Sequence, residues 1–508
     1  MRTPDTTPPD ARDAFFDVSD LEKGAGGRAG RASILVLAMS LLKVVLHLGS
    51  TVILARLVPP AEYGIAALAL PVAIIVSNMA QFGLAQPIVQ MKVVTHALVS
   101  TLFWVNLALG VFFGTLMVAF SGLAARYYNT PEVGPVFMVL GISVLFSSIL
   151  TQYIAMLRRR MQIKLLEYGM LVSFALSLVI AVIAAFFGAS YWAIVLQQTL
   201  QPVLNVLIYA VYLRWVPSSL LKTDLRTARG ALNFGGNIAI ANLLQQIGQA
   251  LPVILIGRHY TPFEAGLYQR SNTMARLIPA RAVTPLASVF VSTLSRLQHD
   301  GPAFRAMFQR MLMNMNLILM PLGVLAFTTS DILVPLALGP DWAPTAPVLA
   351  WLCLLLLQNS FDQGVTWALN ACGASRQIRT TGVIGLILVI AVLAVVGFDR
   401  PVVVLAATLM LANQFIRLPI NAVLALRHTH VDMKTILRGY VLDLAVAGGA
   451  IGLVLLLRHE MAAAAPWVQL GAACLLVAIL YAIRIVVDPE IRRDVVRVLG
   501  TLGHLGKN

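Results

Sequence analysis

The sequence predicts an all-α polytopic membrane protein with about fourteen transmembrane helices. We expect two parallel six-helix lobes around a central cavity, followed by two C-terminal helices. Three observations support this fold: 59% of the 508 residues are hydrophobic and only 12% are charged, the apolar residues gather into long runs, and one motif recurs in both halves. Soluble domains are about 25% charged, so most of this surface needs a non-aqueous solvent.

Fourteen segments meet the requirement for a membrane helix, which is about 20 mostly apolar residues. They lie near 33–56, 63–90, 97–121, 134–156, 167–187, 190–213, 232–257, 265–294, 307–329, 345–371, 380–398, 402–425, 437–457 and 466–486. Polar residues interrupt the segments near 265–294 and 345–371, which are therefore the least uniform. No polar stretch is long enough to build a soluble domain.

These spans divide the chain into five parts. We expect a flexible cytoplasmic leader in 1–32, an N-lobe in 33–216, a C-lobe in 229–425, two further spans in 437–486 and a cytoplasmic tail in 487–508. The leader is polar and rich in proline. It lacks a short apolar core followed by a cleavage site, so we expect no cleaved signal peptide.

Basic residues are distributed asymmetrically between the two sides of these spans. With the N-terminus in the cytoplasm, 27 of the 37 Lys and Arg residues fall on the cytoplasmic side. Only Arg56, Arg126, Arg258, Arg400 and Arg458 fall on the opposite side, and the other five lie within spans. The positive-inside rule then places both termini in the cytoplasm. Cations spaced between apolar runs indicate membrane topology rather than nucleic-acid binding, despite the net charge of +15.

A short motif recurs after the first and the seventh spans. The first copy is Arg56-Leu57-Val58-Pro59-Pro60-Ala61-Glu62-Tyr63-Gly64, and the second is Arg258-His259-Tyr260-Thr261-Pro262-Phe263-Glu264-Ala265-Gly266. Arginine, proline, glutamate and glycine match at one offset of 202 residues. Six spans separate the copies, so the two halves have the same orientation and are related by an axis along the membrane normal.

Further fragments resemble the polysaccharide transporters of the multidrug/oligosaccharidyl-lipid/polysaccharide (MOP) superfamily, the Wzx-type flippases. In the first half they are Leu54-Ala55-Arg56-Leu57, Gln81-Phe82-Gly83-Leu84, Leu102-Phe103-Trp104-Val105-Asn106 and Leu157-Arg158-Arg159-Arg160-Met161. In the second half they are Asn233-Phe234-Gly235-Gly236-Asn237, Gly266-Leu267-Tyr268-Gln269-Arg270, Leu294-Ser295-Arg296-Leu297 and Gly339-Pro340-Asp341-Trp342. The resemblance covers about 20–425. It implies export of an undecaprenyl-pyrophosphate-linked oligosaccharide across the bacterial inner membrane by alternating access, for O-antigen, capsule or exopolysaccharide assembly.

Two ionisable residues lie inside the first span. Lys43 is close to mid-bilayer, and His47 follows one turn later on the same face. A lysine at the bilayer centre costs about 2.5–3.5 kcal/mol, so it should face a partner or a wet cavity. Two interpretations remain: a cavity-lining pair of residues, or a structural contact of Lys43 with a carbonyl or with Asp362.

The eighth span carries Arg270, Arg276 and Arg281. On an ideal helix Arg270 and Arg281 point in nearly the same direction, while Arg276 points away from both. The pyrophosphate implied by the resemblance is anionic, and guanidinium groups suit it. The alternative for Arg270 is that its side chain extends to the outer membrane interface.

Amides are concentrated in spans seven, ten and twelve: Asn237, Asn242, Gln245, Gln246 and Gln249; Gln358, Asn359 and Gln363 beside Asp362; and Asn413, Gln414 and Asn421 beside Arg417. Such groups bind sugar hydroxyls or hold helices together, and Asp362 could instead pair with Arg417. The candidate substrate-binding residues are therefore Lys43, His47, Asn237, Gln249, Arg270, Arg276, Arg281, Asp362 and Arg417.

The sequence shows no enzyme motif, and we expect neither a cofactor nor a metal. Cys353, Cys372 and Cys474 lie in apolar segments without metal-ligand spacing. Two other functions stay open: a drug or ion-coupled antiporter of the same superfamily, and a membrane glycosyltransferase or polymerase of the same pathway. The outer loops are too short for the catalytic domain of such an enzyme. Expected partners are the lipid-linked oligosaccharide, membrane lipids, and the polysaccharide polymerase and chain-length machinery, with no nucleic acid.

Overall fold

The computed structural model describes residues 11–16, 25–91, 93–220, 225–283, 287–489 and 492–493. All regular secondary structure in these ranges is helical, which confirms the predicted all-α class. Contacts between residues divide the chain into two compact units, Met1–Gly266 and Leu267–Asn508. The lobe boundary that we expected between 216 and 229 stays a prediction.

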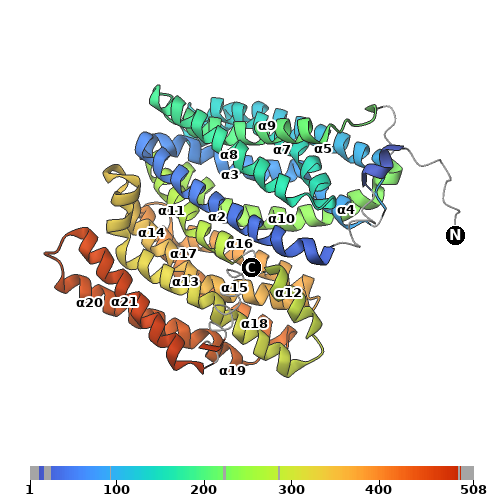
Figure 1. Ribbon diagram of the computed structural model, residues 1–508. Coiled ribbons are helices and arrows are strands. Elements are labelled where there is room, and N and C mark those ends of the chain that lie inside the picture. The colour runs from blue at the N-terminus through green and yellow to red at the C-terminus, as the bar shows by residue number, and fades with distance from the viewer. Residues whose placement is uncertain are drawn as a thin grey trace. The chain divides into compact units, whose positions relative to one another are not determined.

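Unit 1 is built around a central helix, α7 (Figure 1). Its helices are η1 (Ala11–Phe16), α2 (Ala25–Leu57), α3 (Pro60–Gln81), α4 (Ala85–Gln90), α5 (His96–Ala119), α6 (Ser121–Tyr128), α7 (Val133–Arg159), α8 (Ile163–Phe186), α9 (Trp192–Leu213) and α10 (Leu225–His259). The helices α3, α5 and α9 pack on α7, and α8 packs on α9 and α2. Four helices from separate parts of the sequence, α3, α7, α8 and α9, are thereby brought together.

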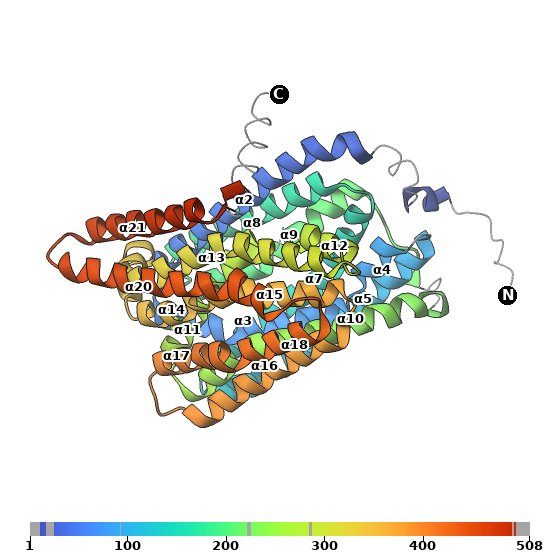
Figure 2. The ribbon, with the colours of Figure 1, turned by 90° about the horizontal axis from the view of Figure 1, so that it is seen from below.

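Unit 2 is organised by α13, a helix of 38 residues. Its helices are α11 (Pro262–Ala282), which begins in the last residues of unit 1, α12 (Ala287–Arg296), α13 (Gly301–Leu338), η4 (Pro340–Trp342), α14 (Thr345–Cys353), α15 (Leu355–Ala371), α16 (Ser375–Val396), α17 (Val402–Ala412), η5 (Asn413–Arg417), α18 (Leu418–His428), α19 (Met433–Ile436), η6 (Leu437–Val441), α20 (Leu442–Glu460) and α21 (Pro466–Val487). The helices α14, α15, α20 and α21 pack on α13, and Figure 2 shows α20 and α21 side by side.

Helix ends follow local chemistry. The hydroxyl of Thr95 accepts a hydrogen bond from the Leu98 N–H at the start of α5, and the carboxylate of Asp300 does the same for the Ala303 N–H at the start of α13. Gly397 ends α16 with φ +67°, a backbone angle that glycine adopts without strain. The loops between spans are therefore fixed by residues suited to end helices.

Eleven helical segments of the described residues are long and apolar enough to cross a membrane. They are Pro60–Gln81, His96–Ala119, Val133–Arg159, Ile163–Phe186, Trp192–Leu213, Gly301–Leu338, Thr345–Ala371, Arg376–Val396, Val402–His428, Met433–Glu460 and Pro466–Val487. Each coincides with one expected span. The other three expected spans fall on α2, α10 and α11 with α12, so the number fourteen stays a prediction. The chain is a multi-pass membrane protein.

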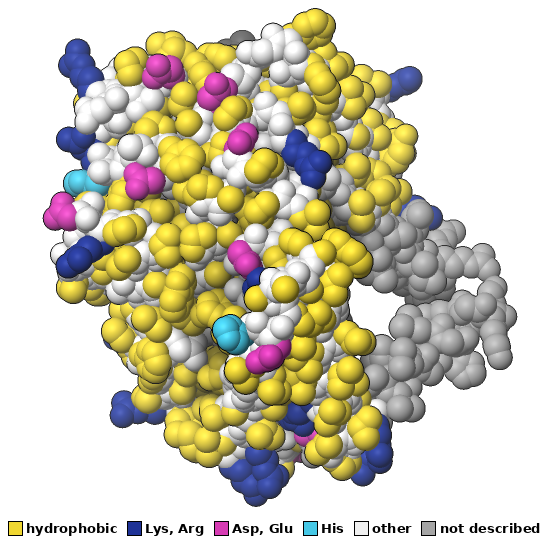
Figure 3. Space-filling model, turned by 90° about the vertical axis from the view of Figure 1, so that its left-hand side faces the viewer, with side chains coloured by type: hydrophobic (Ala, Val, Ile, Leu, Met, Phe, Trp, Pro, Cys, Tyr) yellow, Lys and Arg dark blue, Asp and Glu magenta, His cyan; other side chains and the backbone are white. Residues whose placement is uncertain are grey.

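The outer surface of the helices is suited to lipid. Figure 3 looks onto the left-hand side of Figure 1, where the helices end, and hydrophobic side chains predominate even there while charged side chains are scattered. Large apolar residues such as Phe187 and Val395 are 88% and 85% exposed. Exposure of this extent is unfavourable in water and favourable against acyl chains.

A short N-terminal segment docks against unit 1. Within η1, Phe16 is 1% exposed, and the carboxylate of Asp13 accepts a hydrogen bond of 2.6 Å from the His96 N–H. The buried guanidinium of Arg159 donates to the carbonyl of Phe16 at 3.0 Å, and the guanidinium of Arg160 lies 4.1 Å from the Phe15 ring. These contacts differ from the flexible leader that we expected, because a buried aromatic ring and two cationic partners hold this part of it in place.

Candidate functional site

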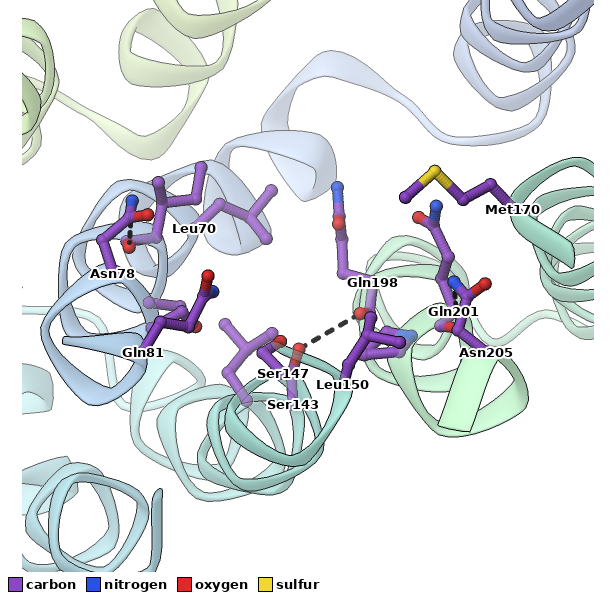
Figure 4. A pocket seen from close by; sticks show the side chains of 15 residues that line it. Leu70, Asn78, Gln81, Ser143, Ser147, Leu150, Met170, Gln198, Gln201 and Asn205 are labelled. Carbon is purple, nitrogen blue, oxygen red and sulfur yellow. Dashed lines mark hydrogen bonds between the residues drawn. The ribbon is translucent and has the colours of Figure 1, made fainter. Parts of the chain in front are cut away.

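A polar pocket of about 360 Å³ lies within unit 1, between α3, α7, α8 and α9 (Figure 4). Its polar lining consists of Ser77, Asn78 and Gln81 from α3, Ser143 and Ser147 from α7, and Gln198, Gln201 and Asn205 from α9. None of the described residues that line it is charged. The pocket therefore presents uncharged hydrogen-bonding groups between helices that are otherwise largely apolar.

Helical spacing places these side chains on the faces that meet at the pocket. Residues three, four or seven positions apart share one face of a helix, as Gln198, Gln201 and Asn205 do on α9. Pro202 also lines the pocket and has no N–H to bond the carbonyl of Gln198, four residues earlier. The Ser143 hydroxyl donates to this free carbonyl at 3.2 Å. A proline in α9 and a serine in α7 thus stabilise this side of the pocket together.

Several of these amides remain available to a ligand. Asn78 and Asn205 each donate to a carbonyl of their own helix, four residues earlier. The side-chain amides of Gln81, Gln198 and Gln201 have no partner among the described residues. Asn205 is 3% exposed, and its side-chain oxygen is buried without a hydrogen bond. The pocket therefore contains unused donors and acceptors.

None of these pocket residues is among the candidates expected from sequence. Charges and spans dense in amides stand out in a sequence, whereas the pocket is lined by a few neutral groups from each of three spans. The spacing of Gln198, Gln201 and Asn205 was the available signal.

Lys43 has a partner that the sequence analysis did not name. Its ammonium forms an ion pair with the carboxylate of Glu167 on α8, and the two side chains are 12% and 15% exposed. The observed partner of Lys43 therefore differs from both structural partners that we expected, a carbonyl and Asp362. The ring of His47 stacks on Phe174 with centroids 3.9 Å apart, and its Nδ1 lies 2.8 Å from the carbonyl oxygen of Lys43. Glu167, the partner of Lys43, lies one helical turn before Met170, which lines the pocket.

We predict that Lys43→Gln lowers thermal stability, because it leaves the carboxylate of Glu167 without its cation in a largely buried position. Losing a hydrogen bond to a charged group costs about 1.5–3 kcal/mol. Lys43→Arg should be tolerated better, and Lys43→Gln/Glu167→Gln should recover most of the loss. The measurement is the melting temperature of the purified protein in detergent. A double variant less stable than either single variant would contradict the ion pair as a stabilising contact.

Arg270, in unit 2, has a structural contact. It is 5% exposed, and its guanidinium lies 5.4 Å from the ring centroid of Trp342, which is fully buried. A cation over a tryptophan face is a favourable arrangement. The side chain therefore packs inside unit 2 on the Gly-Pro-Asp-Trp turn.

Arg276 and Arg417 both lie in unit 2, one on α11 and the other at the end of η5. Arg276 is exposed and donates to the side-chain oxygen of Asn272 at 2.7 Å, while Arg417 donates to that of Asn413 at 3.3 Å. Arg417 ends a π-helical turn, η5, just before Pro419, which has no N–H to continue the regular ladder. Within the described residues, neither arginine forms an ion pair.

Asp362 is bonded to amides, which corrects the expected alternative of a pair with Arg417. Its carboxylate accepts hydrogen bonds from Asn421 at 2.7 Å and from Gln358 at 3.2 Å. Gln358 also donates to the carbonyl of Asn413. These amides connect α15 to η5 and α18, so here they hold helices together.

The nine expected residues are divided between the two units. Lys43, His47 and Gln249, which is half-buried on α10, belong to unit 1, whereas Arg270, Arg276, Asp362 and Arg417 belong to unit 2. The side chains of Asn237 and Arg281 lie outside the described residues. Within the described residues, Arg276 and Arg417 of the expected set form no ion pair, whereas Lys43 pairs with Glu167.

Comparisons with known proteins agree with this architecture. The chain is 21% identical over 331 residues to the lipopolysaccharide biosynthesis protein WzxC of Escherichia coli (strain K12), which covers 65% of each chain. It spans less than two thirds of the length of the first curated relatives that it matches.

Two solved structures share the fold. The lipid II flippase MurJ, in an inward closed conformation, superposes with a TM-score of 0.70 and 13% identity, covering 91% of this chain and 100% of MurJ. An inward-facing multidrug resistance MATE family transporter of the MOP superfamily superposes with a TM-score of 0.60 and 12% identity, covering 82% of this chain and 98% of the transporter. The family model described as polysaccharide biosynthesis protein matches residues 53–347, more than half of the sequence. The chain is therefore a member of the polysaccharide biosynthesis protein family, with the fold of the MOP transporters, as the sequence resemblance implied.

Proposed function

We propose that this protein is a flippase, which moves an oligosaccharide linked to undecaprenyl pyrophosphate from the cytoplasmic to the outer leaflet of the bacterial inner membrane. The product would serve O-antigen, capsule or exopolysaccharide assembly. Family membership supports this proposal, as does the fold shared with a protein named as a lipid II flippase. We propose the polysaccharide polymerase and the chain-length machinery as partners. We also propose that both termini lie in the cytoplasm.

The observation that carries the proposal is that two cations of unit 2, Arg276 and Arg417, form no ion pair within the described residues and bond only to asparagine side chains there. Cations within membrane segments are costly and usually mark a transport path or a counter-ion. A guanidinium group without an acidic partner is stabilised when an anion binds near it, and planar guanidinium groups bind phosphate oxygens in bidentate fashion. A lipid diphosphate supplies such an anion from within the bilayer.

This arrangement suits alternating access. The diphosphate would leave the water and headgroups of one leaflet by exchanging their hydrogen bonds for those of the arginines. It would be released when the opposite side opens to water, where ions are better solvated. A cation antiporter of the same superfamily would instead need an accessible acid, and the carboxylate of Asp362 is already occupied by Asn421 and Gln358.

We predict that Arg276→Gln and Arg417→Gln each reduce polysaccharide export while the protein stays inserted and folded. One charge-assisted contact contributes about 1.5–3 kcal/mol, which corresponds to about a ten- to a hundredfold loss of substrate affinity. The measurement is complementation of an export-deficient strain, with surface polysaccharide normalised to the amount of protein in the membrane. Arg276→Lys should retain more export than Arg276→Gln, because it keeps the charge.

Arg427→Gln is the matched control, since Arg427 is exposed at the far end of α18, ten residues after Arg417. It should leave export unchanged. Full export by the Arg276→Gln/Arg417→Gln double variant at normal abundance would rule out the proposed anion site.

A further inference from the structure

We infer that the pocket of unit 1 binds the uncharged sugar residues of the substrate and so determines which oligosaccharide is accepted. This inference rests on the proposed function and assigns one part of the substrate to one site. Charge recognition falls to Arg276 and Arg417, and hydroxyl recognition to the amides between α3, α7 and α9.

The lining has the chemistry that a sugar requires. A sugar hydroxyl both donates and accepts hydrogen bonds, and an amide side chain presents a donor and an acceptor side by side. The five amides and three serines of the pocket supply both kinds of group from three helices (Figure 4). All lining residues that the structure describes are uncharged, which disfavours a drug cation or a free phosphate as the occupant.

The same pocket has an apolar side. Leu70, Ile74, Leu150 and Met170 line it together with the amides. A sugar ring presents C–H groups on its faces and hydroxyls around its edge, so aliphatic and amide walls in one pocket match it. The volume of about 360 Å³ falls within the range of small-molecule sites, about 300–1,000 Å³.

The alternative role for amides inside a membrane is to hold helices together, and amides of unit 2 have this role. There, Asn421 on α18 donates to the carboxylate of Asp362 on α15, and Gln358 on α15 donates to the carbonyl of Asn413. In the unit 1 pocket, by contrast, the amides of Gln81 and Gln201 bond to no described residue, and the side-chain oxygen of Asn205 is buried without a partner. Groups that stabilise no helix contact are those a ligand would use.

The test measures binding of two probes to the full-length protein in nanodiscs by calorimetry. The first is the repeat-unit oligosaccharide of the source strain, released from its carrier lipid by mild acid. The second is undecaprenyl pyrophosphate without sugar. In Gln81→Leu/Gln201→Leu, the affinity for the oligosaccharide should fall about ten- to a hundredfold, as expected for loss of two hydrogen bonds, with the sugar-free lipid bound as before. Arg276→Gln should weaken binding of the lipid and spare the oligosaccharide.

Gln197→Leu is the matched control on α9. Gln197 lies outside the pocket and donates to the Ser50 hydroxyl at 3.1 Å, so its loss should lower stability and leave both affinities unchanged. The pocket variants should keep the wild-type melting temperature, because their side-chain amides bond to none of the described residues.

Two results would overturn the inference while the proposed function stands: wild-type oligosaccharide affinity in Gln81→Leu/Gln201→Leu, or equal weakening of both probes, in a protein that still moves lipid-linked oligosaccharide in proteoliposomes. A wild-type protein that moves no lipid-linked oligosaccharide would instead overturn the proposed function.

Discussion

Asp443→Ala is expected to lower the free energy of unfolding by about 1.5–3 kcal/mol, the cost of losing a buried hydrogen bond between charged groups. Asp443 on α20 and Arg484 on α21 are 6% and 9% exposed, and the guanidinium Nε lies 2.9 Å from the carboxylate. Removing the acid leaves the buried guanidinium with Asp488, whose carboxylate lies 2.8 Å from its Nη1.

The ion pair belongs to a network that fastens the last two helices to the rest of unit 2. The side-chain amide of Asn316 on α13 donates to Asp443 at 2.8 Å and to the carbonyl of Gly439 at 2.9 Å. The hydroxyl of Ser360 on α15 donates to the side-chain oxygen of Asn316. Four helices thus meet at one buried carboxylate, and its removal disturbs all of them.

The measurement is thermal or denaturant unfolding of the purified protein, with Asp331→Ala as the control. Asp331 also lies on α13 and pairs with Arg458 of α20, but its side chain is 60% exposed, so its loss should cost at most about 1 kcal/mol. Asp443→Leu/Arg484→Met should recover much of the stability, because apolar residues of similar size replace both charges. Equal effects of Asp443→Ala and Asp331→Ala would contradict a buried network.

The spans could be predicted from sequence because hydrophobic length and loop charge are local properties of the chain. The partner of Lys43 could not. Glu167 lies 124 residues away, and only the packing of α2 against α8 brings the two together. The high cost of a charge in the bilayer showed that Lys43 needs a partner, without showing which residue supplies it.

The candidate site shows the same limit of prediction from sequence, this time for uncharged residues. Charged residues such as Arg276 draw attention in a sequence because each is costly by itself. Neutral residues such as Gln81 and Gln201 are common in membrane helices, and they become a pocket only when α3 and α9 face each other. Aromatic contacts are equally non-local: Trp342 explains the burial of Arg270, 72 residues earlier, and no pattern in the sequence joins them.

Gly64→Ala is expected to be severely destabilising, because a Cβ at this position would lie 1.8 Å from the carbonyl oxygen of Pro262. Backbone atoms cannot move aside as the tip of a flexible side chain can. Overpacking of this kind costs about 1–3 kcal/mol or more, and a clash with a carbonyl belongs at the upper end. We expect reduced abundance in the membrane and a lower melting temperature.

The clash explains why glycine recurs in the repeated motif. A Cβ at Gly266 would lie 2.7 Å from the carbonyl oxygen of Pro60, so each copy of the turn supplies the glycine that the proline carbonyl of the other copy approaches. Reciprocal contacts of this kind are what a two-fold relation between the copies produces. The matching prolines and glycines, 202 residues apart, are therefore partners in one contact within unit 1.

The order of effects tests this contact. Gly64→Ala should be the most harmful and Gly266→Ala less so, because the approach is 1.8 Å in the first case and 2.7 Å in the second. Gly452→Ala on α20 is the control: nothing lies within 4 Å of its Cβ position, and alanine in a helix interior should stabilise by about 0.5–1 kcal/mol. The measurement is the melting temperature of each of the three purified variants, compared with that of the wild type. If Gly64→Ala melts with Gly452→Ala rather than well below it, the two turns do not touch, and the recurrence of glycine needs another cause.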